Sequence, residues 1–247
     1  MNAPAETAPQ LEALDETGIG RVLVVVAHPD DPEYGTSAAA AEWTARGIEV
    51  GYLLLTTGEA GMQRPPEEAA PLRAQEQRKA CTEVGVEHLT ILDFPDGMLE
   101  YGIELRRAIA REIRRFRPDA VITGSGALVV PWGLDHADHR ATGLATIDAV
   151  RDADNRWLFT EQLQDEGLAP WGATWLLLTG AEPNCAVEVS EQSVRRAVAS
   201  LSAHRAYLAD LPWHDAPEDL IPGVLAQAGS QAGSPFAVAF QAHRLRA

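Results

Sequence analysis

The chain has 247 residues and a formal net charge of -16, with 46% hydrophobic and 23% charged residues. This length suits one large α/β domain with a full core, and no shift in composition marks a second domain. The acidic surplus leaves no basic stripe to neutralise phosphates, so we expect neither nucleic acid nor an anionic membrane surface as a partner.

The N-terminal segment and the two cysteines bear on where the chain resides. Residues 1–19 are rich in Ala, Pro and Glu, so we expect a flexible acidic leader ahead of one folded domain at 20–247. The start lacks a basic segment followed by an apolar run, and no stretch approaches the ~20 apolar residues that span a bilayer, which predicts a cytoplasmic protein. Cys81 and Cys185 fit no disulfide framework and are expected to be reduced core thiols.

Apolar runs and helical periodicities alternate from residue 22 onward. Residues 22–27 predict a strand, residues 37–46 a helix and residues 50–55 a second strand, which together make a βαβ unit. The alternation continues with predicted strands at 89–92, 119–123 and 174–179 and predicted helices at 72–84, 103–116 and 140–150. Such alternation predicts parallel strands with helices on both faces.

The C-terminal part is expected to complete the sheet less regularly. Residues 186–189 predict a short strand and residues 191–208 a helix with one apolar face. The Pro- and Gly-rich residues 212–234 predict an irregular surface loop, and residues 235–241 an edge strand. The expected fold is a single-domain, Rossmann-like α/β structure with a doubly wound, mainly parallel sheet and helices on both faces.

Two histidine-containing motifs follow predicted strands. His28 comes directly after the strand at 22–27. His136 and His139 come after the strand at 119–123 and a long loop. In the common strand order 3-2-1-4-5 these two strands are neighbours, and ligands bind outside their carboxyl ends. We therefore expect the two motifs to converge at one edge of the sheet.

The residue types in these motifs favour a metal site. His28, Asp31 and His139 have the composition of an open two-histidine, one-carboxylate site, which leaves positions for water and substrate. Alone, His28 would more often be a hydrogen-bonded strand-end histidine than a ligand, and Asp30-Asp31 would more often be a turn or a helix N-cap. Adjacent carboxylates in a crevice repel each other unless a cation offsets their charge, so a metal held by Asp31 and a base provided by Asp30 explain the pair. Of His136 and His139, only one needs to bind the metal.

Other functions are disfavoured but stay open. A two-histidine, one-carboxylate site can hold Fe(II) for oxygenase chemistry, although a spare carboxylate and an additional histidine suit hydrolysis better. Residues 58–61 lack the spacing and the lysine of a phosphate-binding loop, and no Gly-rich dinucleotide fingerprint follows the first strand. A non-catalytic, metal-retaining sugar-binding protein would not need Asp30 as a base. His204 lies in the last predicted helix, and its role stays open.

Three motifs resemble those of the PIG-L or LmbE-like zinc N-deacetylases. They are AHPDD at 27–31, PDG at 95–97 and HADHR at 136–140, and the resemblance extends over residues 22–207. The resemblance implies that Zn²⁺ is bound by His28, Asp31 and His139. It also implies that Asp30 is the general base.

The same resemblance assigns further roles in the reaction. It implies that His136 assists the developing oxyanion or the leaving amine and that Asp138 orients the His136 ring. Arg73 and Asp96 match positions that hold a sugar. The implied activity is removal of an N-acetyl or related N-acyl group from an aminosugar-containing small molecule, which releases acetate and a free amine. The alternative is an amidase of the same fold that acts on a thiol-cofactor conjugate or an antibiotic intermediate.

Two departures from the usual motifs bear on substrate choice rather than on catalysis. Pro32 stands before Glu33 where the family more commonly has glutamate directly, a variant familiar among actinobacterial members, and Ala137 stands where proline is common. Neither departure removes a predicted ligand. Bacterial relatives act on aminosugar precursors of thiol cofactors, antibiotic intermediates and chitin fragments. A small N-acylated aminosugar or conjugate is therefore the expected partner, and the motifs leave its identity and any homo-oligomer open.

Overall fold

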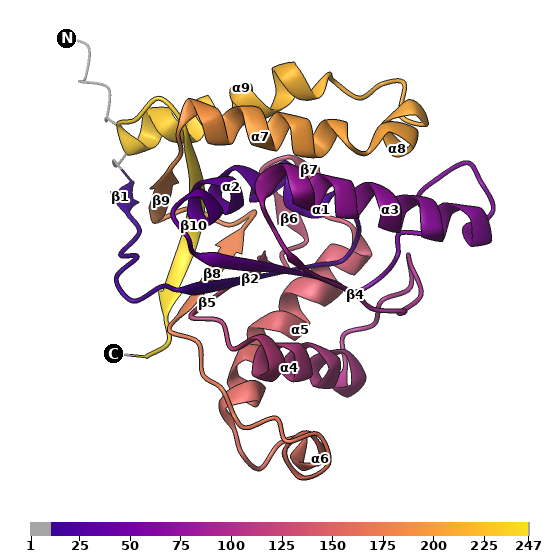
Figure 1. Ribbon diagram of the computed structural model, residues 1–247, viewed down its shortest axis with the longest axis vertical. Helices are drawn as coiled ribbons and strands as arrows, with labels where there is room; N and C mark the ends of the chain where they lie inside the picture. Colours follow the sequence, from indigo (N-terminus) through magenta and orange to yellow (C-terminus); the bar gives the residue numbers. More distant parts are fainter. Residues whose placement is uncertain (1–10, 247) are drawn as a thin grey trace.

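One sheet of eight strands runs through the computed structural model, which describes residues 11–246 (Figure 1). Its strands lie in the order β1-β9-β10-β8-β5-β2-β3-β4. Their bounds are β1 (Glu12–Ala13), β2 (Arg21–Val26), β3 (Glu49–Leu54), β4 (His88–Ile91), β5 (Ala120–Gly124), β8 (Trp175–Thr179), β9 (Cys185–Glu188) and β10 (Ala237–Arg244). A separate two-stranded hairpin consists of β6 (Val129–Val130) and β7 (Gly133–Leu134).

Five neighbouring strands of the sheet run parallel to one another, namely β4, β3, β2, β5 and β8. Counted along the chain, their order β4-β3-β2-β5-β8 is the predicted order 3-2-1-4-5, and the fold class is confirmed. Strand β2 lies in the middle, where Val22 stands opposite both Val50 of β3 and Ala120 of β5. A strand in this place is covered on both faces, which its nearly continuous apolar sequence suits.

Helices cover both faces of the sheet, as the alternation predicts (Figure 1). On one face lie α2 (Ser37–Ala45), α3 (Pro66–Val84), α7 (Glu191–Ser202) and α9 (Pro217–Ala232). On the other lie α4 (Ile103–Phe116) and α5 (Ala137–Asp154). Shorter helices are α1 (Asp31–Gly35), α6 (Thr160–Gln164) and α8 (Arg205–Ala209).

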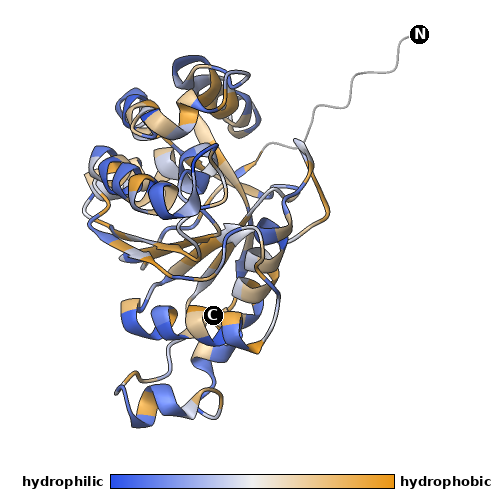
Figure 2. Cartoon of the chain, turned by 90° about the vertical axis from the view of Figure 1, so that its right-hand side faces the viewer, coloured by the Kyte–Doolittle hydropathy of each residue, from blue (hydrophilic) through white to orange (hydrophobic). Residues whose placement is uncertain are grey.

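The period-two alternation of β2 divides the core into two clusters. Val22 and Val24 pack on one side with residues such as Trp43 of α2. Leu23 and Val25 pack on the opposite side with the helices α4 and α5. Successive side chains of a strand point to opposite faces, so one apolar run supplies both cores. Figure 2 shows hydrophobic strands between helices that carry hydrophilic residues on their outer sides.

The C-terminal part differs from the sequence prediction in two places. Helix α9 occupies most of the predicted loop 212–234, because Pro217 sits in the first turn, where a missing N–H costs nothing, and Ile221 and Leu225 are buried. Strand β10 is not an edge strand, because it pairs antiparallel with both β8 and β9. Both predictions were wrong, and both elements turn out to line a cavity beside the site.

Two predicted helices also have different bounds. Helix α3 starts at Pro66, six residues before the predicted 72, since Pro66 occupies the first turn and acidic residues follow it. The predicted helix 191–208 is two helices, α7 and α8, with His204 as the residue before α8. His204 therefore lies in the connection between α7 and α8 rather than on the face of one long helix.

The expected leader is folded over the part that the structure describes. Residues 12 and 13 form β1, which pairs parallel with β9, and Leu14 and Ile19 are buried. The carboxylate of Glu16 accepts hydrogen bonds from Trp43 Nε1 and from Arg46. The flexible-leader prediction is therefore wrong for residues 11–19, because two apolar residues and one carboxylate anchor them, and residues 1–10 lie outside the described chain.

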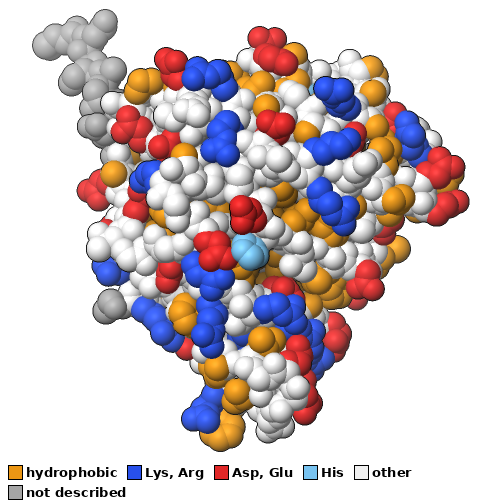
Figure 3. All heavy atoms as spheres, viewed as in Figure 1, with side chains coloured by type: hydrophobic (Ala, Val, Ile, Leu, Met, Phe, Trp, Pro, Cys, Tyr) orange, Lys and Arg blue, Asp and Glu red, His pale blue; other side chains and the backbone are white. Residues whose placement is uncertain are grey.

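The surface and the thiols complete the fold. Figure 3 shows basic and acidic side chains mixed on the face of Figure 1. Arg106 of α4 pairs with Asp152 at 2.8 Å. Cys81 and Cys185 are buried and unpaired, which confirms the expectation of free core thiols. Within the described residues, none of the helices has the length and apolar character that a transmembrane span requires.

Candidate active site

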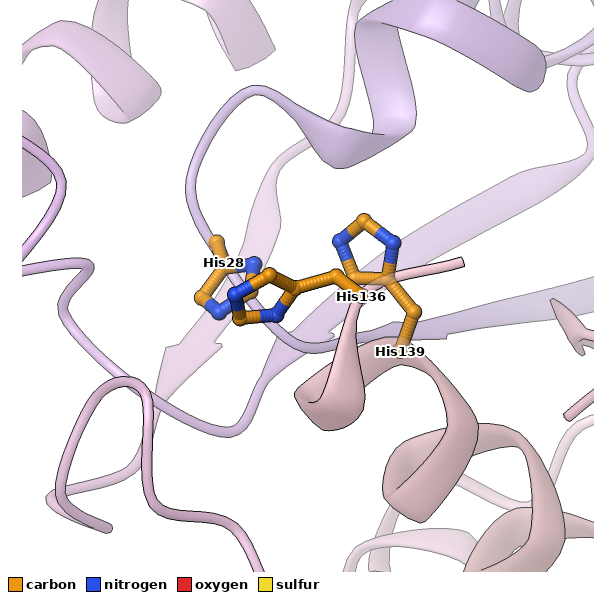
Figure 4. A group of neighbouring side chains, drawn as sticks. All are labelled: His28, His136 and His139. Atoms are coloured by element: carbon orange, nitrogen blue, oxygen red, sulfur yellow. The ribbon is translucent and has the colours of Figure 1, made fainter. Parts of the chain in front are cut away.

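The two histidine motifs meet where β2 and β5 end. After β2 the chain turns through Asp30, whose φ of 82° is left-handed, and Asp31 then begins α1. His136 is the N-cap residue of α5, and His139 follows in its first turn. The ring centroids lie 5.3 Å apart for His28 and His136, 5.2 Å for His28 and His139, and 5.4 Å for His136 and His139 (Figure 4). The predicted convergence is thus observed.

Asp31 lies between two of these histidines. Its Oδ1 is 3.2 Å from His139 Nε2, and its Oδ2 is 3.5 Å from His28 Nδ1. The backbone N–H groups of Ala27 and His28 also donate to Asp31 Oδ2, at 3.1 and 2.8 Å. The carboxylate is therefore held in place, and one nitrogen of each ring faces it.

The outer nitrogens of the same rings contact other carboxylates. His28 Nε2 lies 3.0 Å from Asp96 Oδ1 and 3.2 Å from Asp138 Oδ2. His139 Nδ1 lies 3.0 Å from Asp135 Oδ1. In metal sites the ligating histidine typically gives its second ring N–H to a carboxylate, which fixes the ring and its tautomer. Two such histidines around one aspartate are a donor set that fits a divalent cation, so the chain contains a candidate His/Asp metal site.

Charge balance points the same way. Burial lowers the pKa of His28, but the carboxylates of Asp31, Asp138 and Asp96 outweigh burial and raise it to about 12. Burial likewise lowers the pKa of His139, and Asp31 reverses the shift and raises it to about 9. A surplus of buried carboxylate around imidazole ligands is an environment that a cation stabilises.

Asp30 is buried beside this cluster, with 4% of its surface exposed. Burial raises its pKa to about 6, against the opposing charge of Arg73. The Arg73 guanidinium donates to Asp30 Oδ1, and the Asp30 backbone N–H donates to Gln77 Oε1 at 2.9 Å. The Asp30 carboxylate is thus fixed at the wall of the cavity that contains the histidines.

Arg73 makes more protein contacts than the resemblance implies. It also donates to the carbonyl oxygens of Pro29 at 2.6 Å and Gly58 at 3.0 Å, and it lies 4.1 Å from the centroid of the Tyr207 ring. A Cβ atom on Gly58, at φ +66°, would come within 2.2 Å of the guanidinium. The turn at 58–61 therefore leaves, at its glycines, the space that the Arg73 guanidinium occupies beside Asp30. Arg73 lines the cavity, but its guanidinium is oriented by protein groups.

Asp138 does not orient His136 with its carboxylate. That carboxylate accepts from the backbone N–H groups of Gly97 at 2.7 Å and Leu99 at 3.1 Å, and it contacts His28. Instead the Asp138 backbone N–H donates to His136 Nδ1 at 3.2 Å, as a helix cap does. The PDG motif therefore contacts His28 directly through Asp96, and its Gly97 N–H holds the Asp138 carboxylate.

Several residues around the site were not predicted from the sequence. Asp135 precedes His136 and stands four residues before His139, a spacing that places both on one side of a helix start and could have indicated the pair. Gln77 stands four residues after Arg73 on α3. His204, whose role the sequence left open, is fully buried outside the cavity, with Nε2 3.5 Å from Glu33 Oε2.

The site opens into a cavity of about 650 Å³. Its wall combines the predicted motif residues with aromatic and charged residues from the C-terminal part, among them Tyr207, Trp213, His214 and Asp215. This volume lies within the usual range for small-molecule sites. A lining that combines polar side chains with aromatic rings is suited to a sugar ring.

Comparison with known proteins agrees with this geometry. Residues 23–150 match the PIG-L family, described as GlcNAc-PI de-N-acetylase. The chain is 35% identical over 137 residues to the diacetylchitobiose deacetylase of Thermococcus kodakarensis, covering 53% of this chain and 49% of that protein. It is 33% identical over 137 residues to a probable N-acetyl-alpha-D-glucosaminyl L-malate deacetylase 2 of Bacillus anthracis, covering 52% and 58%.

A solved structure supports the fold over a longer stretch. The N,N'-diacetylchitobiose deacetylase from Pyrococcus horikoshii superposes with a TM-score of 0.83 at 24% identity, covering 93% of this chain and 85% of that one. The sequence matches span about half the length of the two curated relatives. Because the matched residues 23–150 make up more than half of the chain and include both histidine motifs, the chain belongs to the PIG-L family.

Proposed function

We propose that the protein is a metal-dependent hydrolase that removes an N-acetyl or related N-acyl group from an aminosugar-containing small molecule. The observation that carries this proposal is the arrangement of His28 and His139 around Asp31, with Asp30 buried alongside. Two imidazoles and one carboxylate form an open ligand set, and a further carboxylate supplies a base. The names of the matched relatives, which are deacetylases of GlcNAc-type compounds, support the same reaction.

The proposed metal is zinc, with His28, Asp31 and His139 as ligands. Bound there, Zn²⁺ would supply polarisation of the amide carbonyl and a water molecule of lowered pKa. Asp96 and Asp138 hold the His28 ring, and Asp135 holds the His139 ring. These three carboxylates are proposed as the groups that fix the ligand geometry.

Asp30 is the proposed general base. It accepts the proton of the attacking water, while Arg73 donates to its carboxylate and Gln77 accepts its backbone N–H. This assigns Arg73 a positioning role that the resemblance did not imply. The buried guanidinium also offsets part of the repulsion between Asp30 and Asp31.

His136 is the proposed electrophilic group. Because its Nδ1 accepts the Asp138 backbone N–H, the neutral ring carries its proton on Nε2. That N–H can donate to the oxyanion that forms when water adds to the amide, and one donor of this kind is worth about 3 kcal/mol of barrier. As the C–N bond breaks, the proton that Asp30 took from the water passes to the leaving amine, while the His136 Nε2–H keeps its hydrogen bond to the oxygen.

Metal content and amine release test this proposal together. Zinc-reconstituted protein should hold one metal ion per chain and release free amine from N-acetylglucosamine conjugates, as detected with an amine-reactive fluorophore. Folded protein that takes up no metal after reconstitution would overturn the metal centre. Metal-loaded protein that cleaves no member of an N-acylated aminosugar panel would overturn the reaction.

A further inference from the structure

A second cavity adjoins the active site. It has a volume of about 480 Å³ and lies where β2, β5 and β8 end, with α9 and the start of β10 as its opposite wall. Aliphatic side chains of α9 line it, including Ile221, Val224, Leu225 and Ala228. Ala237 and Ala239 of β10 add small apolar surface. These are the two elements that the sequence did not predict in this place.

The two cavities share one wall. Both are lined by Asp31, Tyr34, Trp132, His139 and Leu220. Two of these five residues, Asp31 and His139, are proposed zinc ligands. The apolar cavity therefore begins at the atoms around which an amide would react, and it leads away from the polar cavity.

The cavities differ in the ligand groups that they can accommodate. The larger one contains Arg73, Asp96 and His136, which suit hydroxyl groups and a polar ring. Among residues 11–246, no lysine or arginine lines the smaller one, so an anionic tail would find no partner there. Its polar lining residues, such as Glu33, Thr36 and Thr142, come from the other elements, whereas every residue that α9 and β10 contribute to its wall is aliphatic.

We propose that the apolar cavity binds the N-acyl chain of the substrate, and that this chain is an aliphatic group longer than acetyl. This inference rests on the proposed amide hydrolysis. An amide at the metal centre has a sugar on its nitrogen side and an acyl group on its carbonyl side, and the two cavities match these two parts. An acetyl methyl group would leave nearly all of the 480 Å³ unfilled.

The open edge of the cavity supports this occupant. Trp132 is 69% exposed and Val224 is 48% exposed, although both line the apolar cavity. Large apolar side chains left in water at the rim of a concave site gain from being covered by a ligand. A chain that extends from the metal centre past Leu220 would cover both.

The test is a series of N-acylated glucosamines with acetyl, butanoyl, hexanoyl and octanoyl groups, assayed by amine release with zinc-loaded protein. Each buried methylene contributes up to about fourfold in transition-state binding. We therefore expect kcat/KM to rise severalfold for each two-carbon step until the cavity is filled. No rise from acetyl to octanoyl would overturn the inference.

Two matched substitutions on α9 localise the effect. Ala228→Leu fills the cavity and should lower the octanoyl-to-acetyl ratio of kcat/KM at least tenfold. Ala226→Leu adds the same side chain to the exposed side of the same helix and should leave the ratio unchanged. Val224→Asp, at a half-exposed position, provides a second variant in case Ala228→Leu does not fold. Equal ratios in Ala228→Leu, Val224→Asp and Ala226→Leu would count against the cavity as the acyl site.

A second substrate series separates the remaining outcomes. Methyl and octyl glycosides of N-acetylglucosamine carry the apolar chain on the sugar side. A gain with the octyl glycoside that Ala228→Leu removes would place the aglycone, rather than the acyl chain, in the cavity and would overturn the inference. Failure of the proposed function is distinguishable, because then no substrate of either series, acetyl included, releases amine.

Discussion

The polar and the apolar cavity are built from different parts of the chain. The charged groups of the polar cavity that lie around the candidate metal site come from residues 28–139, which follow β2, β4 and β5 or lie on α3. The apolar cavity is closed by α9 and β10, which follow residue 216. The first part supplies reacting groups whose positions must be correct to within about half an ångström, and the second supplies the shape of the apolar cavity.

This difference predicts two kinds of mutational effect. Substitutions among the charged groups should lower activity on every substrate by a similar factor, because they act on the reacting atoms. Substitutions in α9 should change the ranking of substrates, because they act on only one substituent of the amide. The family match covers residues 23–150 and ends before α9, which agrees with this division of roles.

The largest effect is expected for His139→Ala. Asp31 would lose one of the two rings that face it, and we expect both bound zinc and activity to be lost. Metal analysis by mass spectrometry and the amine-release assay measure the two effects. His136→Ala is the matched control, because His136 is proposed to act on the oxyanion and should keep the metal. If His136→Ala lost the metal and His139→Ala kept it, His136 would be the metal ligand and His139 the group that acts on the oxyanion.

Asp30→Asn should lower kcat by roughly 10²- to 10⁴-fold, the usual contribution of a general base. The amide keeps the size of the carboxylate and an oxygen for Arg73, so fold and zinc content should be retained. The loss should be equal for acetyl and octanoyl substrates if the base acts on water alone. A variant with normal turnover would show that another group takes the proton.

The convergence of these groups could be predicted because it follows from topology. Parallel strands present their carboxyl ends at one edge, so the segments that follow β2 and β5 were expected to meet once the strand order was known. The residue types then limited the chemistry. The partner of Asp138 could not be predicted, since it depends on how closely the backbone of Gly97 and Leu99 approaches.

Helix α9 and strand β10 were missed for a physical reason. Pro217, Pro222 and Gly233 are local signals for a loop, yet Pro217 occupies the first turn and Gly233 the left-handed cap, places where helices accept them. What stabilises α9 is burial of Ile221 and Leu225 against the sheet and α7, which no local pattern contains. The position of β10 between β8 and β9 likewise depends on pairing with strands far away in the sequence, which no local pattern contains.

A smaller effect is expected for Asp96→Ala. His28 would lose one of its two carboxylate partners while Asp138 remains, and losses of this kind typically lie at about 10- to 100-fold in activity or metal affinity. We expect the same loss in kcat/KM for a glycosidic substrate and for a minimal N-acetyl amine. A loss confined to the glycosidic substrate, with unchanged zinc, would assign Asp96 to the sugar, as the resemblance implies.

The smallest effect is expected for Glu16→Gln, which lies in neither cavity and provides a stability reference for the other variants. Burial raises the pKa of Glu16 and Glu42 adds to this, but hydrogen bonds from Arg46 and Trp43 outweigh both and hold it below its usual 4.5. We expect a loss of about 1 kcal/mol at neutral pH, or about 2 to 4 °C in Tm, with unchanged kcat/KM.

The sign of the pH dependence follows from the lowered pKa of Glu16. A carboxyl group with a lower pKa in the folded state stabilises the fold fully above pH 4.5 and loses this effect as the pH falls through its folded-state value. The Tm difference between Glu16→Gln and the parent protein should therefore shrink on acidification below pH 4.5. A Tm difference that stays constant into that range would show that the substituted amide disturbs packing rather than removing a charge, and that the anchor of residues 11–19 is not electrostatic.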